Sequence, residues 1–154
     1  MIFPYIKVSN FVSHKLRERY LPWVRFGIYN PINKSKIVYP LGLVDSGSEI
    51  TFINHELGEQ LGFNIKKGSK LNVKGVGGGS IEAYLFLVGL TIDDEKTNAK
   101  PLNIVGQIAF TYSDFPPTMP QQTAILGTAG FFKYFKVTFE FPRYIEINLI
   151  SPAN

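Results

Sequence analysis

The chain has 154 residues, enough for one ordinary hydrophobic core and short for two, so we expect a single domain over residues 1–154. Hydrophobic residues make up 45% of the sequence and include 13 Phe and 8 Tyr, which excludes a largely disordered chain. The formal net charge is +4 at pH 7, but the lysines and arginines are dispersed in twos and threes. This dispersal favours a solvated surface over a face that binds nucleic acid, so we expect no nucleic-acid partner.

Residue types that bind metals are scarce. The chain contains no cysteine, which excludes disulfides and thiolate metal sites. Its two histidines, His14 and His55, lie far apart in the sequence. We therefore expect no metal and no cofactor.

Two stretches bear on location. The first ten residues, MIFPYIKVSN, contain a proline at position 4 and no long apolar run, so they do not resemble a secretory signal. The longest apolar stretch, residues 83–92, is about half as long as a bilayer-spanning helix. With the absence of cysteine, these observations predict a soluble, cytoplasmic protein without a membrane partner.

Most of the chain consists of short segments rich in β-branched and aromatic residues, separated by Gly, Pro and Asn. This pattern is typical of an all-β protein. In chain order, the expected strands are residues 2–8, 23–29, 37–44, 51–53, 70–76, 80–92, 102–110, 123–126, 136–141 and 144–149. Loops are expected at residues 30–35, 93–100 and 113–122, where turn-forming residues gather.

Two short helices are expected among the strands. The first follows Asn54, a good N-cap, and ends at Gly62, which can adopt the left-handed conformation of a helix C-terminus. The second follows Gly127, where Phe131, Phe132 and Phe135 have helical spacing and predict a buried aromatic face.

The segment PLGLVDSGSEITFI, residues 40–53, places a carboxylate, Asp45, between two apolar runs. Asp-Ser-Gly is by itself a common turn sequence, because Asp and Ser bond their own backbone. Here, however, the triplet follows LGLV and precedes an apolar strand and a short helix. A glycine-rich stretch, KGVGGG at residues 74–79, and the segment TAILGTAGFF at residues 123–132 come later in the chain.

This order of segments resembles the aspartic proteases of the pepsin and retropepsin clan, and small retropepsin-like proteins of prokaryotic type in particular. The resemblance covers roughly residues 23–149. It implies an all-β acid-protease fold, a closed barrel with one or two short helices, that pairs as a two-fold homodimer. The glycine-rich stretch corresponds to the flap that closes over the substrate, and it comprises Gly75, Val76, Gly77, Gly78 and Gly79.

The resemblance also implies roles for the motif residues. Asp45 is the catalytic carboxylate, and the Ser46 hydroxyl bonds the backbone of the opposite loop. Gly47 lets backbone amides approach the carboxylate, and Ser48 bonds its outer oxygen. Thr51 supports the motif.

Gly127 is expected to be a packing position beneath the Asp45 loop, where a side chain would intrude. Residues 75–79 have a second interpretation, which stays open: they form a tight glycine turn that has no function. A phosphate-binding loop is disfavoured, because neither Lys-Ser nor Lys-Thr follows the glycines.

Hydrolysis by this route needs two carboxylates that share one proton, because like charges so close together cannot both ionise. The other aspartates, Asp93, Asp94 and Asp114, lie in loop-like stretches without flanking apolar runs. The second carboxylate must therefore be Asp45 of a second copy of the chain. We predict a hydrolase, an aspartic endopeptidase that cleaves peptide or protein substrates as a homodimer and favours mildly acid pH.

Two other functions compete with this prediction. One is a catalytically silent domain of the same fold that binds peptide or only dimerises. The other is a basic β-barrel in which Trp23, Tyr29 and Tyr39 stack on single-stranded nucleic acid. Residues 1–20 are additional to what a minimal retroviral-type protomer needs. Three interpretations are open for them: a dimerisation strand, a prosegment or a lid.

Overall fold

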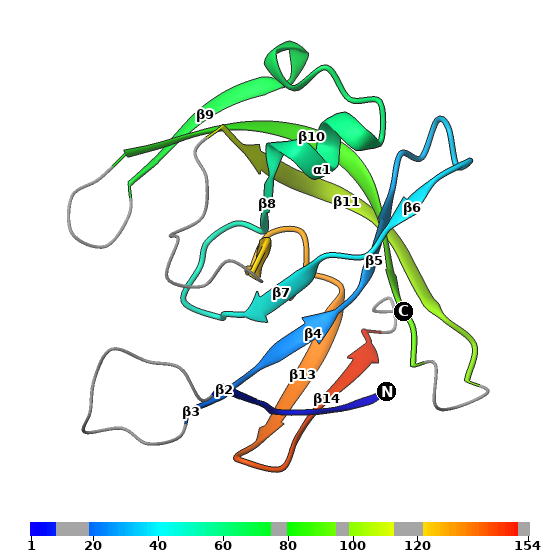
Figure 1. Ribbon diagram of the computed structural model, residues 1–154, viewed down its shortest axis with the longest axis vertical. Helices are drawn as coiled ribbons and strands as arrows, with labels where there is room; N and C mark the ends of the chain where they lie inside the picture. Colours follow the sequence, from blue (N-terminus) through cyan, green and yellow to red (C-terminus); the bar gives the residue numbers. More distant parts are fainter. Residues whose placement is uncertain (9–18, 75–79, 95–98, 113–121, 151–154) are drawn as a thin grey trace.

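The computed structural model of the chain describes residues 1–8, 19–74, 80–94, 99–112 and 122–150 (Figure 1). Strands dominate it, which confirms the expected all-β class. The strands are β1 (Ile2–Pro4), β2 (Ile6–Val8), β3 (Arg19–Leu21), β4 (Trp23–Arg25), β5 (Gly27–Tyr29), β6 (Ile37–Val38), β7 (Leu41–Val44), β8 (Phe52–Asn54), β9 (Ser69–Lys74), β10 (Ser80–Ile92), β11 (Leu102–Thr111), β12 (Ala124–Leu126), β13 (Phe135–Glu140) and β14 (Tyr144–Leu149).

A nine-stranded sheet curls into a half-barrel, with the order β4-β7-β12-β8-β11-β10-β5-β6 and with β9 paired to β10 (Figure 1). β4 and β5 are separated only by Phe26, yet they pair at opposite ends of this order, β4 with β7 and β5 with β10. The bend at Phe26 is held by a hydrogen bond from its N–H to the carbonyl oxygen of Pro40 (3.3 Å). One bent hairpin, residues 23–44, therefore brings the two ends of the sheet together.

The long strands β10 and β11 pair in antiparallel register from Ala83 opposite Thr111 to Ile92 opposite Leu102. Their side chains alternate between the two faces of the sheet. One face forms the main core, in which Phe26, Ile108 and Phe110 are fully buried. Burying such side chains, at about 1.5–3 kcal/mol each, is the main force that curls the sheet.

The first eight residues are bound to the rest of the same chain. β1 pairs with β14, and β14 pairs with β13, which makes a separate three-stranded sheet. The N-terminal ammonium of Met1 donates to the carbonyl oxygen of Ile147 (2.8 Å). The strand expected over residues 2–8 is thus two short strands, and β2 pairs with β3, which the sequence pattern did not predict.

The first expected helix is present as α1 (His55–Gln60). The side chain of Asn54 caps it by accepting a hydrogen bond from the N–H of Glu56 (3.2 Å), and Gly62 follows with φ of 82°. Both end signals are therefore confirmed. A short 3-10 helix, η1 (Ile65–Lys67), was not predicted. Within the described part of the chain, no helix is both long and apolar enough to cross a membrane.

The second expected helix, after Gly127, is wrong. Gly130 has φ of 91°, which a right-handed helix does not allow, and a Cβ there would lie 2.6 Å from the carbonyl oxygen of Gln107. The backbone forms turns instead, with the N–H of Phe132 bonded to Gly127 O (3.2 Å). The aromatic spacing still predicts burial correctly for Phe131 and Phe135.

Candidate active site

Asp45 directly follows β7, and the fold holds it from both sides. β7 pairs with β4 on one edge and with β12 on the other. The N–H of Asp45 donates to the carbonyl oxygen of Leu126 (3.0 Å), the last residue of β12. The carboxylate is thereby fixed at the point where two parallel strands end.

β12 lies between the two strands that flank the Asp45 loop. It pairs in parallel with β7 and in antiparallel with β8, so the chain crosses the end of β12 on its way from β7 to β8. Residues 45–51 form this crossing, which is the turn between β7 and β8 in Figure 1. Segments far apart in the sequence, residues 41–54 and 122–131, therefore make one unit around Asp45.

The Asp45 carboxylate is half-buried and accepts a hydrogen bond from its own loop. The N–H of Gly47 donates to Oδ1 (2.9 Å), and the N–H of Ser48 donates to the backbone oxygen of Asp45 (3.2 Å). A Cβ on residue 47 would lie 3.2 Å from Oδ1, which is unusually tight, so glycine suits this position. As expected, a glycine at position 47 lets a backbone amide approach the Asp45 carboxylate closely.

The two serines of the motif differ in their surroundings. Ser46 is exposed, and its expected partner, the opposite loop of a second copy, stays a prediction. The hydroxyl of Ser48 donates to the carbonyl oxygen of Ile50 (2.8 Å) and not to the Asp45 carboxylate, contrary to expectation. A partner two residues along the chain is reached with little loss of conformational freedom, which explains the preference.

A hydrogen-bonded contact between Thr51 and Gly127 connects the end of the Asp45 loop to the segment after β12. The fully buried hydroxyl of Thr51 accepts from the N–H of Gly127 (3.0 Å) and lies 3.4 Å from its carbonyl oxygen. A Cβ on Gly127 would lie 2.3 Å from the carbonyl oxygen of Ile50. Gly127 is therefore the close-packing position that was expected.

Thr128 makes contacts that the sequence did not predict. Its hydroxyl lies 2.7 Å from the carbonyl oxygen of Glu49 and 3.1 Å from that of Ser48, and its N–H donates to the latter (2.8 Å). These partners are about eighty residues away in sequence, so no local pattern points to them. The neighbouring Ala129 forms an isolated parallel bridge with Ile50.

The predicted flap falls between β9 and β10, which pair with each other in antiparallel register. Lys74 and Ser80 are its last paired residues, so residues 75–79 connect the two strands. The predicted flap residues lie outside the described residues.

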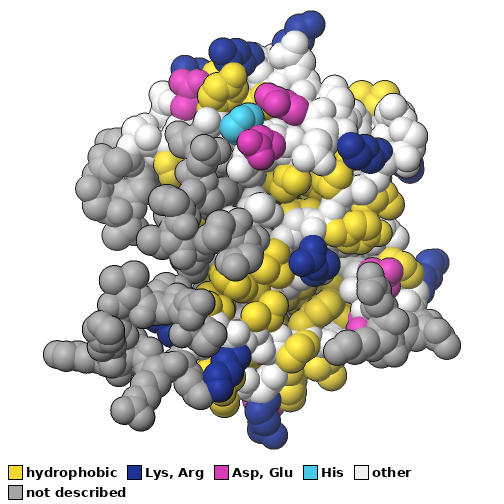
Figure 2. Space-filling model, viewed as in Figure 1, with side chains coloured by type: hydrophobic (Ala, Val, Ile, Leu, Met, Phe, Trp, Pro, Cys, Tyr) yellow, Lys and Arg dark blue, Asp and Glu magenta, His cyan; other side chains and the backbone are white. Residues whose placement is uncertain are grey.

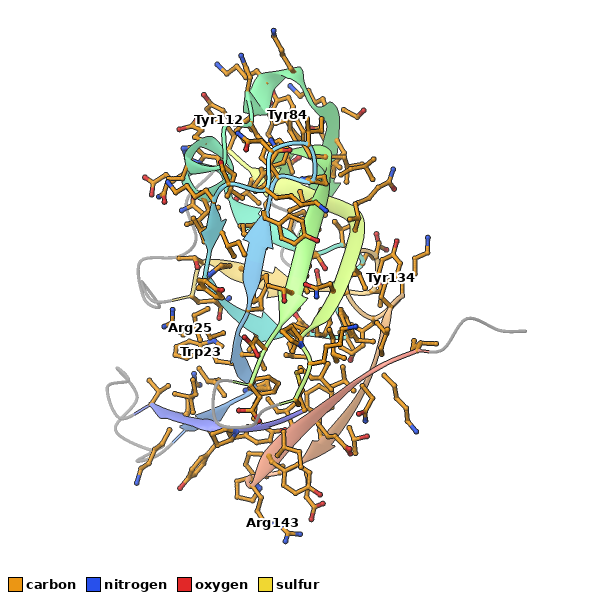
Figure 3. All side chains as sticks on the ribbon, turned by 90° about the vertical axis from the view of Figure 1, so that its right-hand side faces the viewer. Trp23, Arg25, Tyr84, Tyr112, Tyr134 and Arg143 are labelled. Atoms are coloured by element: carbon orange, nitrogen blue, oxygen red, sulfur yellow. The ribbon has the colours of Figure 1, made fainter. Side chains whose placement is uncertain are left out.

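A polar cluster lies on this hairpin. The Tyr84 hydroxyl donates to one carboxylate oxygen of Glu82 (2.8 Å), and Lys70 Nζ lies 2.6 Å from the other. These hydrogen bonds, that of Lys70 first, lower the pKa of Glu82, and the same contacts raise the pKa of both Lys70 and Tyr84. The Tyr84 hydroxyl is thus engaged with Glu82, and Tyr84 also meets the ring of Tyr112 (Figure 3).

A small apolar cluster, separate from the main core, connects the Asp45 loop to this hairpin. Its buried members are Phe52, Ala83 and Ala109. Five partly buried side chains pack against them: Ile50, Leu71, Val73, Leu85 and Ile125. We call this set the apolar wall. Its nonpolar surface comes from the Asp45 loop, through Ile50, and from the strands β8 to β12.

No other described aspartate stands beside Asp45. Asp93 and Asp94 line a cavity of about 230 Å³ together with Arg25. Arg25 pairs at the start of β7, whereas Asp45 follows the end of that strand. The two groups therefore lie at opposite ends of β7, and Asp114 lies outside the described residues.

The larger cavity, of about 450 Å³, is separate from the candidate site. It is lined by residues 59 and 62–66 and by Tyr112, none of which belongs to the Asp45 loop or the apolar wall. His55 stacks on Tyr112 with ring centroids 5.1 Å apart. Over the described ranges, no three His, Cys, Asp or Glu residues come together as a metal site requires.

Trp23 cannot be a stacking residue for nucleic acid, because it is buried in β4. Its indole N–H donates to the side-chain oxygen of Gln122 (3.0 Å), which is also buried. Lys and Arg side chains are scattered over the face seen in Figure 2 and do not gather into one patch. The nucleic-acid interpretation thus loses Trp23, whereas Tyr39 is exposed.

Comparisons with known proteins give a likeness to solved structures but none at the level of sequence. No family model and no curated protein matches the sequence. Among solved structures, the chain is similar to a retropepsin-like aspartic protease from Rickettsia conorii, with a TM-score of 0.48 and 12% sequence identity, over 84% of each chain.

Proposed function

We propose that the protein is an aspartic endopeptidase whose active site forms from the Asp45 loops of two copies of the chain. The observation that carries the proposal is the setting of Asp45. Its carboxylate is half-buried, accepts the Gly47 amide at 2.9 Å, and stands where the ends of β7 and β12 meet. Burying a carboxylate is costly unless donors stabilise it, and a carboxylate kept in such a place is a candidate functional group.

The chemistry requires a second carboxylate. Two Asp45 side chains facing each other across a two-fold axis share one proton and hold a water molecule between them. The ionised carboxylate takes a proton from the water as its oxygen attacks the peptide carbon, and the protonated one gives its proton to the carbonyl oxygen. Collapse of the resulting diol then returns a proton to the nitrogen, the C–N bond breaks, and an acid and an amine leave.

Substrate binding follows from the surroundings of Asp45. The apolar wall includes Ile50 of the loop and Ile125 of β12, and it continues onto β9 through Leu71 and Val73. An extended peptide lying along this surface buries nonpolar side chains and pairs its backbone with that of the protein as an added strand does. The proposed substrate is therefore an unfolded segment of a protein with apolar residues next to the scissile bond.

The test is cleavage of an unstructured protein from about pH 3 to pH 7, at high protomer concentration, by wild type and by Asp45→Asn. We expect an acid optimum, inhibition by pepstatin, and a loss of at least about 10³-fold in the variant. Asp93→Asn is the matched control, because Asp93 lies at the opposite end of β7, and it keeps full activity. If wild type is inert while it forms a dimer, the proposal fails and a silent binding domain takes its place.

A further inference from the structure

Thr128 makes a clamp between the loop after β12 and the Asp45 loop. The carbonyl oxygen of Ser48 accepts from the Thr128 N–H (2.8 Å), and that of Glu49 accepts from the Ala129 N–H (2.9 Å). The Thr128 hydroxyl contacts both oxygens, at 3.1 and 2.7 Å respectively. It has one proton to donate, so the shorter contact, to Glu49, is the main bond.

This clamp connects directly to the catalytic carboxylate. The residue held by Thr128, Ser48, donates its own N–H to the backbone oxygen of Asp45 (3.2 Å). Gly47, between them, donates to Asp45 Oδ1 (2.9 Å). A continuous series of short contacts therefore leads from the Thr128 hydroxyl, through one turn of backbone, to the carboxylate.

The hydroxyl acts on orientation more than on folding. Both carbonyl oxygens already accept a backbone N–H, so they stay partnered without it. Thr128 is itself exposed, which leaves the burial of the site independent of its side chain. Removing the hydroxyl frees the turn that carries Ser48 without opening the core.

We infer that Thr128 is a positioning residue, which fixes the turn that aims the Asp45 carboxylate. The inference rests on the proposed function, in which two such carboxylates must meet within hydrogen-bond distance of one water molecule. Misplacement by about 1 Å can cost on the order of 10²-fold in rate, so one lost contact of this kind matters.

The experiment compares Thr128→Val, which keeps the shape and removes the hydroxyl, with Thr128→Ser, which keeps the hydroxyl. Thr138→Val, an exposed position on β13, is the control. Without substrate, NMR measures hydrogen exchange at the Gly47 and Ser48 amides. With substrate, kcat and KM are measured across the pH range.

We expect Thr128→Val to speed exchange at both amides by about ten-fold, to lower kcat by about ten-fold with KM nearly unchanged, and to shift the pH profile. Thr128→Ser restores all of these, and the control changes none. Unchanged amide exchange in Thr128→Val overturns the inference. Faster exchange with unchanged kcat also overturns it, since the role is then structural only. If wild type itself is inert, the proposed function fails, and the exchange data alone decide whether Thr128 holds the turn.

Discussion

The hydroxyl of Thr51 contacts both polar backbone groups of Gly127, its N–H at 3.0 Å and its carbonyl oxygen at 3.4 Å. One buried side chain thus satisfies the backbone of the loop that supports Asp45. Thr51→Val leaves both groups without this partner, so we expect the free energy of unfolding to fall by about 1–3 kcal/mol. Denaturant titration measures the loss. Thr51→Ser, which keeps the hydroxyl, recovers most of it, and equal stability of Thr51→Val and wild type would contradict the account.

Gly127 and Gly62 are glycines for different physical reasons, lack of space for a side chain at Gly127 and a positive φ at Gly62. A Cβ on Gly127 meets the backbone of Ile50 at 2.3 Å, whereas one on Gly62 meets nothing within 4 Å. Gly62→Ala therefore costs only the strain of a positive φ, about 1–2 kcal/mol. Gly127→Ala must displace the Asp45 loop, and we expect a larger loss of stability together with lost peptidase activity. Thermal unfolding of both variants tests the order, and a Gly127→Ala protein more stable than Gly62→Ala would refute it.

Glu82 makes stability depend on pH. Hydrogen bonds from Lys70 and Tyr84 lower its pKa below the ordinary value of 4.5 in the folded protein. A lowered folded-state pKa adds stability above the unfolded-state pKa, and this stability is lost as the pH falls through the folded-state pKa. Wild type should therefore exceed Glu82→Gln in stability at pH 7, with the difference shrinking below pH 4.5. Urea titrations at several pH values measure it, and Glu146→Gln serves as the control. A difference that grows in acid would show that the sign is wrong.

Trp23, labelled in Figure 3, lies on β4 beside β7 and forms a buried hydrogen-bonded pair with Gln122. Trp23→Phe keeps an aromatic ring and leaves the Gln122 oxygen without its donor, so we expect a loss of about 1–3 kcal/mol. The double variant with Gln122→Met removes both polar groups and should recover part of that loss. Strictly additive losses, measured by the four-protein cycle, would argue that the two residues are not coupled.

Local patterns predicted much of the fold. The bounds of β10 and β14 agree with the sequence expectation, because alternating and β-branched residues fill whole strands there. Asn54 and Gly62 marked the ends of α1, since both act through their own backbone neighbours. Signals that depend only on nearby residues were thus sufficient for most elements.

The remaining features depend on distant partners. The helix expected after Gly127 fails because Thr128 and Ala129 bond carbonyls some eighty residues away and Gly130 turns the chain. The sequence predicted that Asp45 and Gly127 belong to one site. It did not predict the role of Thr128, because the partners of Thr128 are about eighty residues away. The motif predicts that Ser48 bonds the carboxylate, whereas its hydroxyl donates to the carbonyl oxygen of Ile50. Which of several acceptors a hydroxyl uses is decided by loop geometry, which composition and spacing do not encode.

The most direct test of the shared site mixes wild-type and Asp45→Asn protomers at constant total concentration, well above the dimer dissociation constant, and measures peptidase activity. If each active site needs Asp45 from both copies, mixed dimers are inactive and activity follows the square of the wild-type fraction. An equal mixture then retains about one quarter of the wild-type activity, because random pairing leaves that share of wild-type dimers. Co-purification of untagged wild-type protomers with a tagged Asp45→Asn protein confirms that mixed dimers form. Activity that falls in simple proportion to the wild-type fraction would contradict a site built from two Asp45 carboxylates.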